Sequence, residues 1–251
     1  MLLFRYCLFS SLLAMAAGGV VAGEDALPPP DFKVGYSLYM SGIKVAKVER
    51  RFSRSSDGTY RYLSEASVTG LIALFRDDRI VEESHGRING STIMPDYYKY
   101  SRTGSKKARD VSVHFNWDSN RVTNRVNGDA WHMDVEPGIL DKLLYQYIIM
   151  RDLKKDKSTL TYTVADGGKA KTYHFESLGR EVINTPLGEM ETIKLGRYKS
   201  GSKRELIIWC APDLHYLPVK VRDMEEDNNY VAVINSLDGL TSQESGVRSQ
   251  E

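Results

Sequence analysis

The chain lacks the features that mark several large classes of protein. Its 34 lysine and arginine residues are balanced by 33 aspartate and glutamate residues, so no basic excess points to nucleic acid as a partner. Of its two cysteines, Cys7 lies in an N-terminal leader and leaves Cys210 without a partner for an intrachain disulfide. Packing must therefore stabilise the fold, and 41% hydrophobic residues are enough to exclude a chain that is disordered throughout.

Motifs of common enzymes are also missing. The sequence contains no Gly-x-Ser-x-Gly element, no His-Glu-x-x-His motif and no paired cysteine spacing. Gly168-Lys169-Ala170 lacks both the upstream glycine and the following hydroxyl residue of a phosphate-binding loop. We therefore expect no nucleotide, no other cofactor and no metal ion.

The histidines do not form a pattern that favours metal binding. His114, His132 and His174 each lie between two apolar or aromatic residues of a strand pattern. Since successive strand residues point to opposite faces, all three are predicted to face away from the core. Histidines that face outward from separate strands are more often solvated than bound to metal.

Residues 1–22 have the pattern of a secretory signal peptide. Arg5 precedes an apolar run, and small residues follow up to Ala22. Gly18 and Gly19 interrupt the run before it reaches the roughly 20 residues of a membrane span. We expect cleavage after Ala22 and a mature chain without a transmembrane segment.

The remaining sequence is predicted to hold one domain. Residues 23–31 contain three consecutive prolines and read as an N-terminal linker. Residues 32–240 show no interdomain linker and are predicted to form a single β-rich domain, and the polar residues 241–251 a disordered C-terminal tail.

Strand patterns dominate that domain. Alternating apolar and polar residues recur about every ten residues, with turn signals such as Asp57-Gly58 and Asn127-Gly128 between them. One helix is predicted from Gly138 to about Leu153, because apolar residues recur there at three- and four-residue spacing. The prediction is a mainly β protein: an antiparallel β-roll or barrel-like sheet with one helix packed on or in it.

A few polar residues are candidates for chemistry. Glu83 and His85 share one face of a strand and would suit an acid–base pair, although a polar outer face of the strand explains them better. Basic clusters, among them Arg50, Arg51 and Arg54, lie near predicted turns and are interpreted as solvated residues that keep sheet edges from pairing. Two clusters that met in space would instead form a patch for anionic lipid or polysaccharide.

Four segments, at residues 36–45, 164–169, 184–188 and 209–219, resemble a bacterial envelope family known as domain of unknown function 3108. The resemblance covers nearly the whole mature chain and rests on turns and strand ends. It implies a periplasmic protein of Gram-negative bacteria with a β-rich, roll-like or barrel-like fold. The family has no established activity and so brings no catalytic residues. Cys210 stands where a leucine-like residue is usual, which agrees with a buried thiol.

Together these features favour a non-enzymatic periplasmic protein that binds an envelope component or partner and supports envelope integrity. The most specific form of this hypothesis is that the protein carries lipid, since a curved sheet covered by a helix could enclose an apolar groove, as in periplasmic lipoprotein carriers. The predicted groove or lid residues are Leu71, Ile72, Leu74, Phe75, Leu140, Leu144 and Tyr147. Two alternatives stay open: a hydrolase of envelope glycan or peptide that uses Glu83 and His85, and a protein–protein scaffold with a plugged core.

Overall fold

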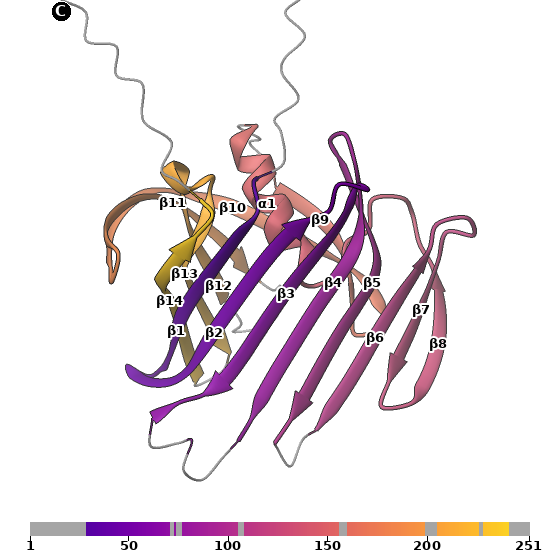
Figure 1. Ribbon diagram of the computed structural model, residues 1–251, viewed down its shortest axis with the longest axis horizontal. Coiled ribbons are helices and arrows are strands. Elements are labelled where there is room, and N and C mark those ends of the chain that lie inside the picture. Colours follow the sequence, from indigo (N-terminus) through magenta and orange to yellow (C-terminus); the bar gives the residue numbers. More distant parts are fainter. Residues whose placement is uncertain are drawn as a thin grey trace, which may run out of the picture.

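In the part of the chain that the structure describes, fourteen strands form one antiparallel sheet (Figure 1). The computed structural model describes residues 29–70, 73, 77–104, 108–155, 160–198, 205–225 and 228–240. The strands are β1 (Phe32–Met40), β2 (Ile43–Arg54), β3 (Thr59–Val68), β4 (Arg79–Asn89), β5 (Thr92–Thr103), β6 (Arg109–Asn116), β7 (Arg121–Val126), β8 (Asp129–Asp134), β9 (Leu160–Asp166), β10 (Lys169–Thr185), β11 (Gly188–Tyr198), β12 (Glu205–Ala211), β13 (Leu217–Glu225) and β14 (Asn228–Asp238). Their order in the sheet is β8-β7-β6-β5-β4-β3-β2-β1-β14-β13-β12-β11-β10-β9, so β8 and β9 form its two edges.

The hairpin turns follow the sequence signals. Asn127 and Gly128 join β7 to β8 with φ values of 50° and 103°, and Ser41 and Gly42 join β1 to β2 with φ values of 48° and 84°. Two positive φ values in a two-residue turn match the right-handed twist of the adjoining strands. The predicted turn at Asn127-Gly128 is confirmed.

The sheet curls around helix α1 (Leu144–Lys154), which lies on its inner side (Figure 1). Eight of the 11 helix residues are buried, so the helix is enclosed on most sides. Near its C-terminal end, Arg151 donates from Nη1 to the carbonyl oxygen of Ser91 at 2.9 Å, in the turn between β4 and β5. The predicted β-rich sheet with a single packed helix is confirmed.

The helix begins later than the sequence predicts. Gly138 has a φ of +93°, and Leu140 instead extends the edge of β9 by a parallel bridge to Val164. The Leu140 N–H donates to the Thr163 carbonyl at 2.9 Å, and the Ala165 N–H donates to the Leu140 carbonyl at 2.8 Å. The prediction of helix over 138–143 was therefore wrong, because the backbone of Leu140 is satisfied by a strand rather than by a helical turn.

The edges of the sheet approach each other at one point. Trp131 of β8 donates from Nε1 to the carbonyl oxygen of Gly168, in the turn between β9 and β10, at 3.3 Å. Gly168 has a φ of +75°, and a Cβ there would lie 2.2 Å from the indole Cζ2 atom. Only glycine suits both the backbone and the close contact, so the sequence of this turn allows the curled sheet to come near closure.

Parts of the predicted organisation fall outside the described residues. The predicted signal peptide 1–22 and tail 241–251 are among them, and the single domain over 32–240 stays a prediction. Within the predicted linker, Pro29 is buried, and its carbonyl oxygen accepts a hydrogen bond from the Tyr147 hydroxyl at 2.5 Å.

Candidate functional site

Two neighbouring rows of cross-strand partners on the inner face of the sheet differ in exposure. The first row crosses β2 to β7 and is buried throughout: Phe52, Tyr62, Ser84, Tyr98, Val113 and Asn124. The second row lies two residues from the first along each strand: Arg50, Ser64, Glu82, Tyr100, Val111 and Val126. All of these except Ser64 are half-buried. One end of the curled sheet is therefore filled, and exposure of its inner face begins at the second row.

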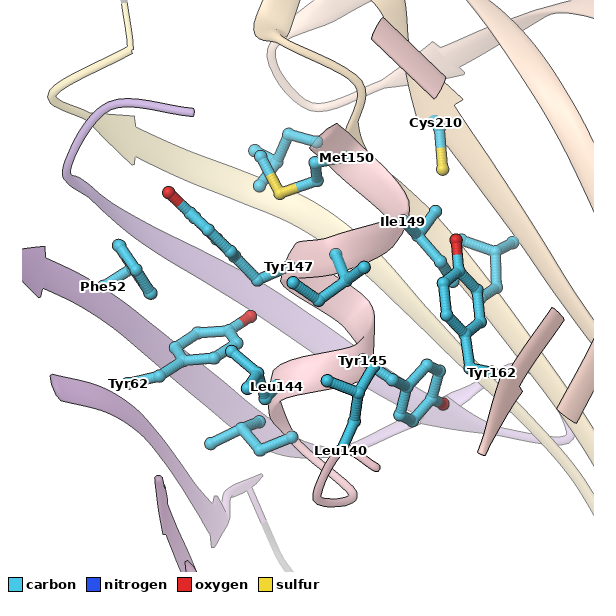
Figure 2. Packing of buried hydrophobic residues seen from close by; sticks show 14 of the residues in the cluster. Phe52, Tyr62, Leu140, Leu144, Tyr145, Tyr147, Ile149, Met150, Tyr162 and Cys210 are labelled. Carbon is cyan, nitrogen blue, oxygen red and sulfur yellow. The ribbon is translucent and has the colours of Figure 1, made fainter. Parts of the chain in front are cut away.

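Helix α1 fills the buried end by aromatic packing (Figure 2). The Tyr147 ring stacks on Phe52 with centroids 3.8 Å apart and planes 12° apart, and Tyr62 meets it edge-on at 6.4 Å. On the other side of the helix, the Tyr145 ring lies 5.2 Å from that of Tyr173 in a T-shaped pair. The helix thus holds both halves of the sheet and is packed as a plug.

The predicted groove residues divide between this plug and the undescribed chain. Leu140, Leu144 and Tyr147 are buried in the core around the helix (Figure 2). Leu71, Ile72, Leu74 and Phe75 lie outside the described residues, in the connection from β3 to β4. A ligand-contacting role for any of the seven stays a prediction.

Asp141 ties the start of the helix to the sheet. One carboxylate oxygen accepts hydrogen bonds from the Leu143 and Leu144 N–H groups, both at 2.8 Å, and the other accepts one from the Ser84 hydroxyl at 2.6 Å. The Ser84 hydroxyl also contacts the Tyr60 hydroxyl at 3.0 Å. Complete burial raises the pKa of Asp141 to about 6, even though these hydrogen bonds favour the charged form. Asp141 is therefore both an acceptor for two N–H groups at the start of α1 and a buried carboxyl group whose pKa is close to neutral pH.

Arg50 lies at the boundary between the two rows. Its Nη1 donates to the side-chain carbonyl of Gln146 on α1 at 2.5 Å, and its guanidinium carbon lies 5.6 Å from the centre of the Tyr36 ring. Its Nε atom is buried and has no hydrogen-bond partner among the described residues. Burial acts to lower the pKa of Arg50, but nearby Tyr62, Tyr36 and Glu82 together raise it above its ordinary value. The Arg50 side chain is therefore a permanently charged hydrogen-bond donor, next to the buried first row of the inner face.

Other charged side chains on the inner face contact a side chain of another residue. Arg102 contacts Asp78 through Nη2 and Oδ1 at 3.4 Å, and the Arg197 guanidinium lies 4.0 Å from the centre of the Tyr173 ring. Glu82 accepts a hydrogen bond from the Tyr98 hydroxyl at 2.6 Å. Arg50 differs from Arg102 because the described residues place no carboxylate in ion-pair contact with it.

The hydrolase candidates lie on the outer face. Nε2 of His85 is 2.9 Å from Oε1 of Glu83, and Nε of Arg61 contacts the same oxygen at 2.5 Å. The Glu83 and His85 side chains are 21% and 41% exposed, on the side of the sheet that faces away from α1. The pair therefore forms, but as part of an open ion-pair cluster rather than in a pocket.

The predicted outward histidines also lie on this outer face. His114, His132 and His174 are exposed, as predicted. His132 Nδ1 is 3.0 Å from the Thr123 hydroxyl, and His174 Nδ1 is 2.9 Å from the Thr161 hydroxyl. Within the described ranges, no group of three histidine, cysteine, aspartate or glutamate side chains is placed to hold a metal ion.

A hollow of about 620 Å³ is lined mostly by outer-face residues of β1 to β4 and β14. Two of its charged residues are paired: Glu49 lies 3.1 Å from Lys33, and Glu65 contacts Arg79. Lys44 and Lys47 also line the hollow. Because most of the lining residues are charged or polar, the inner face is the stronger candidate site for an apolar ligand.

Comparisons with known proteins place the chain in a family. A family model described as protein of unknown function (DUF3108) matches residues 35–234. The chain belongs to the DUF3108 family. This confirms the resemblance given by the turn and strand-end motifs. No curated protein matches this DUF3108 chain.

Two solved structures are similar to this DUF3108 protein. The first is a β-barrel-like protein of domain of unknown function DUF1849 from Brucella abortus, with a TM-score of 0.59 and 8% identity over 85% of this chain and 99% of that chain. The second is described as a "putative lipoprotein" from Parabacteroides distasonis, with a TM-score of 0.36 and 10% identity over 85% and 98% of the two chains. The first supports the barrel-like fold, and at these identities neither carries a function.

Sequence reasoning missed both Asp141 and the inward orientation of Arg50. Asp141 stands three residues before Leu144, and an aspartate near the start of a helical pattern is a recognised capping signal. Arg50 alternates with Val48 and Phe52, a pattern that predicts a shared inner face. The interpretation of Arg50 as a solvated residue was wrong, because Arg50 is half-buried and only the neighbouring Arg51 is exposed.

Proposed function

We propose that this protein is an exported, non-enzymatic envelope protein of a Gram-negative bacterium that binds a molecule with an apolar chain. The ligand lies on the inner face of the sheet, at the end that α1 leaves unfilled. The observation that carries the proposal is the change from a buried to a half-exposed row across β2 to β7. A core that served packing alone would not need a half-exposed apolar inner surface.

The apolar character of that surface supports an acyl chain. Beyond Arg50, the inner face continues with partly buried hydrophobic residues on both halves of the sheet: Val48, Tyr100, Val111, Val221 and Ala232. Sites for apolar ligands are typically concave and lined mostly by hydrophobic residues, with a small number of placed polar groups. Among the described residues, no helix is long and apolar enough to cross a membrane.

The leader pattern supports export. We expect the chain to reach the periplasm with Gly23 as its mature N-terminus, and the binding experiments use protein isolated from that fraction. The envelope would supply the ligand, for which lipid is our choice over glycan or a partner protein.

Placing a charge on the surface should weaken binding. In Val111→Asp, a carboxylate replaces a half-buried apolar group on the inner face, and the affinity for a neutral acyl probe should fall by tenfold or more, roughly the cost of losing one good apolar contact. The probe is the methyl ester of 11-(dansylamino)undecanoic acid, and affinity is read from its fluorescence.

Ser112→Asp is the matched control, because Ser112 is the next residue of β6 and lies on the outer face. It should leave the affinity unchanged. Val111→Thr, which keeps the shape of the side chain, serves if the aspartate variant fails to fold. Equal affinity in wild type and both Val111 variants, or no binding by any of them, contradicts the proposal.

A further inference from the structure

Arg50 is a half-buried cation whose hydrogen-bonding capacity is only partly used. Guanidinium carries five N–H groups. Its described partners are the Gln146 carbonyl, the Tyr62 hydroxyl and the face of Tyr36, and Nε is buried without a partner. An unsatisfied buried donor costs free energy, and more so when it is charged. An arginine in this state is a site to which an anion would bind favourably.

The position of Arg50 connects this donor to the proposed apolar surface. On β2, Phe52 lies on one side of it, stacked under Tyr147 of the plug. On the other side lies half-buried Val48, where the inner face becomes exposed. An anionic group held by Arg50 would therefore lie at the inner limit of the surface, with the rest of the ligand extending away from α1.

The surrounding hydroxyl groups favour a carboxylate. Tyr62 and Tyr145 are both buried, which raises the pKa of each, and Arg50 opposes this rise for both. These phenols therefore stay protonated and are available as neutral donors beside the cation. Guanidinium also matches a carboxylate with two parallel hydrogen bonds.

We propose that Arg50 binds the acidic group of a single-chain carboxylic acid whose apolar chain lies on the half-exposed inner face. This rests on the proposed function, since it names the ligand class for the same surface. Arg50, which has no described ion-pair partner, accounts for one acidic group. The apolar residues beyond it account for the chain.

The test compares two probes that differ only in charge: 11-(dansylamino)undecanoic acid and its methyl ester. Wild-type protein should bind the acid roughly tenfold more tightly than the ester, as expected for charge-assisted hydrogen bonds. Arg50→Gln should remove this preference by weakening the acid while leaving the ester unchanged. Arg50→Lys, which keeps the charge but not the planar fork, should retain part of it.

Arg51→Gln is the matched control, because Arg51 is the next residue of β2 and is exposed on the outer face. It should keep the full preference for the acid. If wild type binds acid and ester equally well, the proposed function stands and the role of Arg50 is refuted. An acid preference that survives Arg50→Gln also refutes that role, whereas failure of both probes to bind refutes the proposed function itself.

Discussion

Tyr147→Ala should destabilise the protein by about 3 to 5 kcal/mol, the cost of removing a large aromatic side chain from a core. Tyr147 is fully buried, stacks on Phe52 and donates its hydroxyl proton to the Pro29 carbonyl. The loss should appear as a lower midpoint in urea unfolding followed by circular dichroism.

Tyr147→Phe separates the ring from the hydroxyl. It keeps the stacking on Phe52 and loses only the hydrogen bond to Pro29, so it should cost about 1 kcal/mol. A cost below about 1 kcal/mol for the alanine variant would mean that α1 does not act as a fixed plug, and that it opens as a lid instead.

Relative to the Asp141→Asn variant, the wild-type protein should become more stable as the pH falls from 8 to 4. The pKa of Asp141 is about 6 in the folded protein against 3.8 ordinarily, because burial disfavours the charged carboxylate. Between these values the folded state binds the proton that the unfolded state releases, so its stabilising effect is complete below pH 3.8 and is lost as the pH rises past 6. With each pKa unit worth about 1.4 kcal/mol, the full difference is ~3 kcal/mol.

The measurement is the free energy of unfolding of both proteins at each pH, and the quantity of interest is their difference. Asp141→Asn keeps an oxygen that can accept from the Leu143 and Leu144 N–H groups, so the helix cap is preserved while the titration is removed. The difference is the free energy of unfolding of the wild type minus that of Asp141→Asn. If this difference is independent of pH, or grows as the pH rises, the pKa of Asp141 is not raised in the folded protein.

The sequence predicts elements whose signals are local. Strand alternation identified the outward faces of His114 and His132, and the Asn127-Gly128 dipeptide identified a hairpin, because both depend on backbone geometry within a few residues. The burial of Cys210 followed in the same way from its apolar neighbours and is confirmed.

The errors come from partners that are distant in sequence. Leu140 fits the helical pattern, yet it pairs with Val164. Arg50 was grouped with Arg51, although its side chain meets Gln146, which is 96 residues away. Local periodicity contains no information on which strand or helix will face a residue, so the candidate site emerged only when the sheet register and the position of α1 were known.

Both proposals depend on where the apolar chain lies, and photo-crosslinking tests this directly. The probe is a long-chain fatty acid with a diazirine near its terminal methyl group, and the labelled residues are identified by mass spectrometry. The account predicts labels on the inner-face residues Leu38, Val48 and Ala66, at the end not filled by α1. Labels on their outward neighbours Ser37, Lys47 and Ser67, or on α1 itself, would contradict it.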